Sequence, residues 1–259
     1  MLRISLLIIL CMGVMMLNAQ RECDFVHETV IEFSEFTNVK LEGNIDIFFT
    51  QSENNSILMK TLQEEHINDV HYSFGENTLN IRNEIREDRS NRERRRGRRR
   101  NLVNVNVGVN GANNVKILVY IETSNIESFL HRGAGSITFL GDVDVEKLTF
   151  RIEGVANIEI PKLSVNDFDI QVNGVSNAKI TGKADHIKVR SNGVGRLNLK
   201  DIVATTADVS VNGVGTVNIH STEELSVAIN GVGTVVYYGD PQIKSKSVGF
   251  LGVFRRGRG

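Results

Sequence analysis

The residues most able to do chemistry form one arginine-rich block. From Arg82 to Arg100 the chain reads R-N-E-I-R-E-D-R-S-N-R-E-R-R-R-G-R-R-R, with ten of its nineteen Arg and no Lys. Four acidic residues reduce the net charge of the block to +6, so the other residues carry −7 within a total of −1. Planar guanidinium groups bind phosphate and carboxylate groups bidentately. The block therefore predicts contact with a polyanion: lipopolysaccharide, an anionic surface polysaccharide, extracellular DNA or an acidic protein.

The densest part of this block supplies the candidate polyanion-binding residues, which are Arg92, Arg94, Arg95, Arg96, Arg98, Arg99 and Arg100. The block has no apolar period, so we expect a loop at residues 84–101. The alternative is a solvated, charge-balanced loop that merely tolerates insertion. Sequence-specific nucleic-acid binding is not expected, because no aromatic residue is interleaved with the arginines and no recognition helix is evident.

Other reactive side chains show weaker patterns. Asp142 with Asp144, and Asp167 with Asp169, lie two residues apart and could share a strand face, as in a carbohydrate-cleaving β-helix. Neither pair has a basic partner at a recurrent position, so no catalytic residue is predicted. The six His have no metal-ligand spacing and are expected at or near the surface: His27, His66, His71, His131, His186 and His220. We therefore predict no metal and no cofactor.

The elements that must position these residues come from an internal repeat of about 20 residues. The chain reads E-G-V-A-N at 153, N-G-V-S-N at 173, N-G-V-G-R at 192, and N-G-V-G-T at both 212 and 230. Five copies with no following helix argue against a nucleotide-binding glycine loop. The glycines that anchor the copies, at spacings of 20, 19, 20 and 18 residues, are Gly154, Gly174, Gly193, Gly213 and Gly231.

Apolar residues recur two and four positions before each of these glycines, and one, four and six positions after it. Their alternation with polar residues predicts strands with one buried face. The phase is expected to shift at the glycine, giving strand, tight corner, strand and a short variable connection. The position two after the glycine is always small, which suits a corner with positive φ or close stacking on the next coil.

A 20-residue unit is too short for a propeller blade and favours a β-solenoid, in which each coil adds about 4.8 Å. Degenerate copies around Gly111 and Gly133, and a copy with Ser247 in place of the glycine, extend the regular repeats over residues 102–253. We expect an all-β fold with an irregular N-terminal β cap.

That cap is expected at residues 28–83. Strands are predicted at residues 30–33, 39–41, 45–49 and 57–59, a short helical turn at 63–70, and a hairpin at 71–83 that turns at Gly75-Glu76-Asn77. No Pro- or Gly-rich linker separates the cap from the repeats. We therefore predict a single domain over residues 20–259.

Asparagines form two further columns of the repeat. Asn173, Asn192, Asn212 and Asn230 precede the corner glycines, and Asn198 and Asn218 follow them by five residues. Stacked in a solenoid, such columns predict side-chain amide ladders. The alternative is a flat polar stripe that contacts a ligand or another chain.

The N-terminus has the pattern of a secretory signal from Met1 to Ala19. Arg3 precedes an apolar run at residues 4–17, and the small Ala19 marks a cleavage point. The run is shorter than a membrane span, so no transmembrane segment is expected in the mature chain. The signal predicts export to the periplasm, the outer membrane or the exterior, with Cys23 as the single remaining thiol.

The N-G-V-G-T-V-N-I units, together with the opening F-x-x-V-K-L-E-G-N-I-D-I-F-F-T-Q at residues 36–51, resemble the bacterial head GIN domain family, labelled autotransporter adhesin heads. The likeness covers residues 30–253. It implies a right-handed β-helix at the cell envelope or outside the cell, and it brings no agreed ligand or site residues. The arginine-rich insertion departs from the family pattern.

These patterns together predict an exported, non-enzymatic β-solenoid that acts as an adhesin or envelope binding module and contacts polyanions through its arginine-rich loop. A structural envelope protein that self-associates is the alternative. A β-helical carbohydrate-active enzyme is the third hypothesis.

Overall fold

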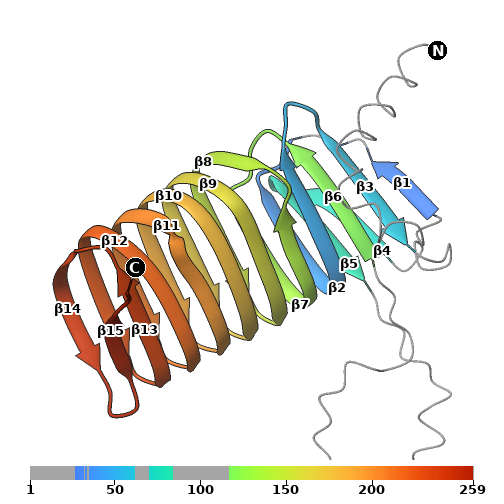
Figure 1. Ribbon diagram of the computed structural model, residues 1–259. Coiled ribbons are helices and arrows are strands. Elements are labelled where there is room, and N and C mark those ends of the chain that lie inside the picture. The colour runs from blue at the N-terminus through green and yellow to red at the C-terminus, as the bar shows by residue number, and fades with distance from the viewer. Residues whose placement is uncertain (1–26, 32, 34, 62–69, 84–116, 259) are drawn as a thin grey trace, which may run out of the picture.

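The structure is a computed structural model, and it describes residues 27–258 except residues 32, 34, 62–69 and 84–116. The described residues form one 15-stranded sheet that winds into a β-solenoid of about six turns with coils of about 20 residues (Figure 1). The predicted all-β solenoid is thus confirmed. The signal peptide, Cys23 and the arginine-rich loop lie outside the described residues. So do residues 63–69 of the predicted helical turn and residues 102–116, which include the predicted repeat copy around Gly111.

The strands in chain order are β1 (His27–Ile31), β2 (Asn38–Gln51), β3 (Ser56–Thr61), β4 (Val70–Gly75), β5 (Thr78–Asn83), β6 (Ile117–Thr123), β7 (Ser128–Phe139), β8 (Asp142–Ile152), β9 (Val155–Val172), β10 (Val175–Ser191), β11 (Val194–Val211), β12 (Val214–Ile229), β13 (Val232–Tyr238), β14 (Gln242–Val248) and β15 (Val253–Arg256).

Parallel, in-register pairing stacks equivalent residues of successive coils. β9, β10, β11 and β12 pair side by side along their lengths, and β2, β7 and β8 extend the stack toward the N-terminus. Val175, for example, lies between Val155 and Val194. Each side chain therefore meets the same repeat position of the coils before and after it.

Each coil has three sides around an apolar core. In β9 the alternation of buried and exposed residues is broken at residues 161–162 and 166–167, and a third corner follows at 173–175. The connection expected between strands is instead part of one continuously paired strand. Coils of different length remain paired because the register shifts within these strands, as it does between Ile180 and Gly182 where β10 pairs with β9.

The expected phase shift at the corner glycine was wrong. The small residue two positions after each glycine continues the inward row, as buried Ala156 and Ser176 show. The valine one position after the glycine faces outward instead. In all five copies its side chain is between 44% and 51% exposed.

The corner glycines are explained by close stacking and not by backbone twist, because none of the five has a positive φ. A Cβ added at Gly193 would lie 1.8 Å from the carbonyl oxygen of Gly174, one coil earlier. The other four corners show the same approach at 1.9 to 2.1 Å. A side chain at this position would therefore point along the rod into the neighbouring backbone.

The N-terminal region is less irregular than expected. The strands predicted at 39–41 and 45–49 are one strand, β2, which lies on β7 as a full coil. The predicted hairpin is present as β4 and β5, with Glu76 (φ 48°) and Asn77 (φ 60°) in its turn. Both central residues have positive φ, as the tight two-residue turns of hairpins require. β3 joins β1 to β6 through antiparallel pairs and completes the cap.

The C-terminal coil also differs from the expected alignment. Val248 pairs with Ile229, and Ser247 with Ala228, so Ser247 lies on a strand and is no corner residue. The corner falls at residues 249–252, where Gly252 N–H donates to the Gly249 carbonyl at 2.9 Å. The sequence alignment missed this because no corner glycine occupies the equivalent position.

His131 is fully buried, contrary to the expected surface location. It stacks between Leu41 and Ile152 in the inward row, and neither ring nitrogen has a hydrogen-bond partner. Burial lowers the pKa of His131 from its ordinary value of 6.5, against a smaller opposing effect of the Asp46 charge. The imidazole is therefore held neutral.

Gly193→Ala is expected to lower the free energy of unfolding by about 2–3 kcal/mol, because the new methyl group would overlap the Gly174 carbonyl. Gly141→Ala is the matched control, since a Cβ there has nothing within 4 Å. Urea unfolding followed by circular dichroism measures both. Equal stability of the two variants would contradict the stacking explanation.

His131→Leu is expected to weaken the pH dependence of stability. Since the folded-state pKa lies below 6.5, the unfolded chain binds more protons as the pH falls through that value, and the free energy of unfolding decreases. Between about pH 7.5 and about pH 5.5 the free energy of unfolding should therefore fall more for the wild-type protein than for the variant. Identical pH dependence in urea titrations would show that His131 titrates normally.

Candidate functional site

The described strands on either side of the arginine-rich loop in the sequence lie at one end of the rod (Figure 1). β5 ends at Asn83 and β6 begins at Ile117, and both strands pair with β2. The candidate residues Arg92 to Arg100 lie outside the described residues. Their anion-binding role remains a prediction, now with a location for the two strands that hold the loop.

A ladder of alternating charges begins beside this loop, at the corner position just before the glycine. Arg82 Nε lies 3.9 Å from Glu42 Oε2, Arg132 Nη1 lies 3.6 Å from Glu42 Oε1, and Arg132 Nε lies 2.6 Å from Glu153 Oε2. The hydrogen bond from Arg132 is the largest cause that lowers the pKa of Glu153. A hydrogen bond from Lys40 does the same for the pKa of Glu42.

The ladder continues along the same corner as stacked amides. The Nδ2 groups of Asn192, Asn212 and Asn230 donate to the Oδ1 atoms of the preceding Asn at 2.9, 2.8 and 2.8 Å. The second predicted column has a bond from Asn218 to Asn198 at 3.3 Å. The predicted amide ladders therefore form. Along the coils from Asn173 to Asn230, this corner therefore carries amide side chains that bond to one another along the rod.

A row of half-exposed valines runs beside the amides. Its members follow the corner glycines and stack in register: Val155, Val175, Val194, Val214 and Val232. Sequence patterning treated them as part of the apolar alternation. The small residue that follows each valine faces inward, so the valine itself must face outward. The sequence contained this signal as the small residue two positions after each corner glycine.

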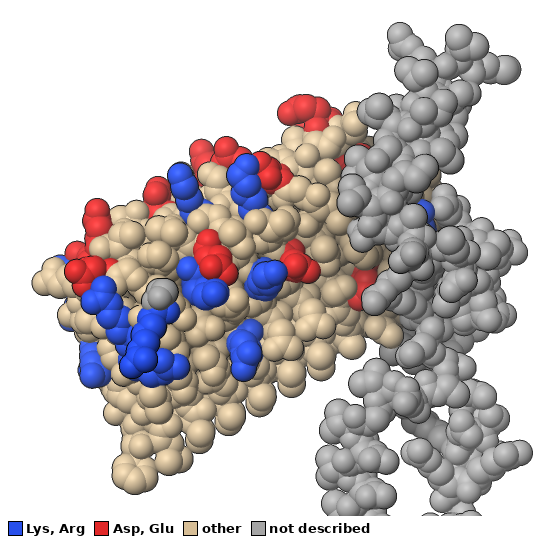
Figure 2. All heavy atoms as spheres, in the orientation of Figure 1, with Lys and Arg blue, Asp and Glu red and all other residues tan. Residues whose placement is uncertain are grey.

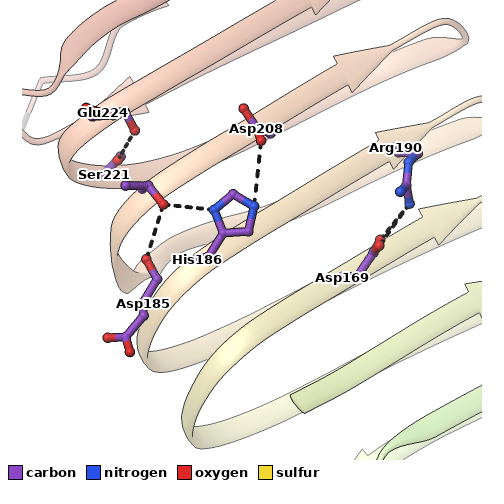
Figure 3. Close-up of polar contacts among 8 residues, drawn as sticks. Asp169, Asp185, His186, Arg190, Asp208, Ser221 and Glu224 are labelled. Atoms are coloured by element: carbon purple, nitrogen blue, oxygen red, sulfur yellow. Dashed lines mark hydrogen bonds and ion pairs between the residues drawn. The ribbon is translucent and has the colours of Figure 1, made fainter. Parts of the chain in front are cut away.

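A second polar cluster lies on another side of the rod (Figure 3). His186 Nδ1 lies 2.8 Å from Thr206 Oγ1, and its Nε2 lies 3.6 Å from Asp208 Oδ2. Nearby, Arg190 Nη1 bonds both carboxylate oxygens of Asp169 at 2.9 Å. The sequence prediction missed this partner of Asp169, although Arg190 follows it by 21 residues, about one coil.

The geometry of this cluster favours a structural role. A hydroxyl, imidazole and carboxylate in series resemble a nucleophile and its base, but Thr206 Oγ1 also lies 3.5 Å from the Asp185 carbonyl oxygen. Catalysis further requires groups that converge in a concave pocket. Two depressions on the described surface, of about 300 and 460 Å³, are lined by residues outside this cluster.

Of the remaining candidate carboxylates, that of Asp142 is engaged in an ion pair. Asp142 pairs with Lys162 of the next coil, and the backbone N–H of Asp144 donates to Gln51 Oε1 at 2.7 Å. Within the part of the chain that the structure describes, no three His, Cys, Asp or Glu side chains gather as metal ligands. Across the same residues, no helix has the length and apolar character of a membrane span.

The fold and these columns define a parallel β-solenoid with flat, ladder-bearing sides. The chain belongs to the family described as "Putative auto-transporter adhesin, head GIN domain", which matches residues 35–241. The family resemblance of the repeats is thereby confirmed, and membership places the chain among exported adhesin-type proteins. A search of the curated proteins finds no significant match.

Solved structures share this fold at low sequence identity. A putative adhesin from Bacteroides fragilis has 21% identity and a TM-score of 0.74, covering 91% of this chain and 98% of its own. A putative lipid binding protein from Parabacteroides distasonis has 16% identity and a TM-score of 0.63, covering 90% and 96%. A putative adhesin from Parabacteroides merdae has 15% and 0.56, covering 92% and 98%. At these identities the likeness establishes the fold alone.

Asn212→Asp is expected to lower the free energy of unfolding at neutral pH by about 1 kcal/mol, because a carboxylate cannot donate to Asn192 Oδ1. The deficit should shrink at about pH 3, where a protonated Asp regains a donor. Asn166→Asp is the control, since Asn166 is exposed and outside both ladders. A pH-independent deficit in chemical unfolding would argue against the ladder.

Proposed function

We propose that the protein is an exported, non-enzymatic binding module of the adhesin type. The observation that carries this proposal is the solenoid itself. Polar side chains on its sides bond to side chains of the neighbouring coils, as the pairs Arg190–Asp169, Asn192–Asn173 and Lys162–Asp142 show. Membership of an adhesin-head family supports the same class. The fold acts as a rigid support that holds a binding segment away from its point of attachment.

The binding segment in this proposal is the arginine-rich loop, through Arg92, Arg94, Arg95, Arg96, Arg98, Arg99 and Arg100. The block from Arg82 to Arg100, which contains these residues, has a charge of +6 against −7 elsewhere, so an anionic polymer would be attracted to one region of the chain. The described strands before and after the loop, β5 and β6, both pair with β2 at one end of the rod, which supports an anion contact at that end. Lipopolysaccharide or an anionic surface polysaccharide is the partner class that this charge favours.

Self-association is the second candidate function. The exposed valine row supports it, since five apolar side chains in register form a narrow, uncharged stripe. Contact of this stripe with a second copy would bury it without opposing charges. Sedimentation of the ligand-free protein over a range of concentrations distinguishes this possibility from the monomeric binding module.

Replacement of the seven arginines from Arg92 to Arg100 by glutamine is expected to abolish retention on immobilised heparin or lipopolysaccharide. Wild-type retention should weaken as salt rises, because the contact releases counterions. The control replaces three basic residues of the coils, Lys183, Lys188 and Lys200, by glutamine. Retention that is insensitive to salt, or unchanged by loss of the arginines, would refute the polyanion proposal.

A further inference from the structure

The C-terminal corner exposes large apolar side chains in an otherwise small-residue row. Phe250 is 102% exposed and Leu251 is 59% exposed. They occupy the tight turn that joins β14 to β15, where earlier coils have Gly231 and Val232. This turn projects past the row of corners at that end of the rod (Figure 1).

The strands on both sides of this turn are basic. Residues 241–258 contain five cationic side chains and no Asp or Glu. Lys244 pairs with Glu224 at 2.9 Å and Arg256 with Asp240 at 3.4 Å. No described carboxylate lies within ion-pairing distance of the remaining three, which are Lys246, Arg255 and Arg258. Blue side chains accordingly gather at this end in Figure 2.

A second copy stacked end to end does not suit this surface. Lys246 takes the inward position of Val227 in the previous coil, and its Nζ lies 5.2 Å from the Phe254 ring centre. A cation therefore covers the end of the core where another coil would add its apolar side chains. Two such ends would also repel each other.

We propose that the C-terminal coil docks the rod on an anionic phospholipid bilayer. Phe250 and Leu251 enter the interfacial region, where aromatic and aliphatic side chains are favourably buried. Lys246, Arg255 and Arg258 contact the negatively charged headgroups, as basic residues near such surfaces do. Together they provide the two signals, apolar insertion and charge, that reversible membrane attachment requires.

This attachment is distinct from the anion contact proposed for the arginine-rich loop. Seven successive strand pairings separate β2, which holds the flanks of the loop, from β15. At about 4.8 Å for each pairing, the two regions lie about 34 Å apart. One end would hold the bilayer while the other contacts a soluble or surface polymer.

The absence of tryptophan gives a direct test, because Phe250→Trp introduces the only indole of the chain. With vesicles of phosphatidylcholine containing about one third phosphatidylglycerol, we expect a blue shift of its emission and quenching by brominated lipid. Tyr72→Trp is the matched control, since Tyr72 is 45% exposed on β4 at the opposite end. Its emission is expected to remain unchanged.

Charge dependence is tested in the Phe250→Trp background. Arg255→Gln with Arg258→Gln is expected to raise the lipid concentration for half-maximal shift at least tenfold, whereas Lys183→Gln with Lys188→Gln should leave it unchanged. Circular dichroism verifies that each variant folds. An unshifted Phe250→Trp emission in vesicle-bound protein, or an equal shift with pure phosphatidylcholine, would overturn the proposal. A protein with its loop arginines intact that shows the shift but is not retained on heparin would refute only the loop function.

Discussion

Backbone hydrogen bonding between identical coils is the constraint on which the whole structure depends. Parallel in-register pairing sets every residue about 4.8 Å from its counterpart in the next coil. Side chains must then be compatible with copies of themselves: valine on valine, amide on amide, and opposite charges in alternation. Gly193 shows the strictest form of this rule, because the Gly174 carbonyl oxygen occupies the place of its Cβ.

The repeat spacing made the solenoid and its amide ladders predictable from the sequence. Asn192 and Asn212 are placed one coil apart by the glycine spacing alone, and their bond at 2.8 Å follows from stacking. The direction of each side chain was harder to predict. The outward direction of Val155 and the burial of His131 were not predicted. The alternation of inward and outward side chains continues unchanged through the corner, and at the copy around Gly154 only the small buried Ala156 marks it.

The binding surfaces were less accessible to sequence reasoning than the fold. The contact of Arg190 Nη1 with both carboxylate oxygens of Asp169 joins residues whose pairing depends on the exact coil length, which varies from 18 to 20 residues. The alignment at Ser247 failed for a related reason, since Phe250 takes the corner position where glycine is otherwise found. The arginine-rich loop has no period at all, so its charge was informative and its shape was not.

The direction of the interstrand bonds has a mechanical consequence. They join each strand to the strand of the next coil and therefore run roughly along the rod. Tension applied between the β15 end and the β5 end would open these bonds one row after another, because each coil contacts only its neighbours. Such a molecule would lengthen under load as its coils unfold one at a time. Each coil would release about 20 residues of extended chain before the next coil unfolds.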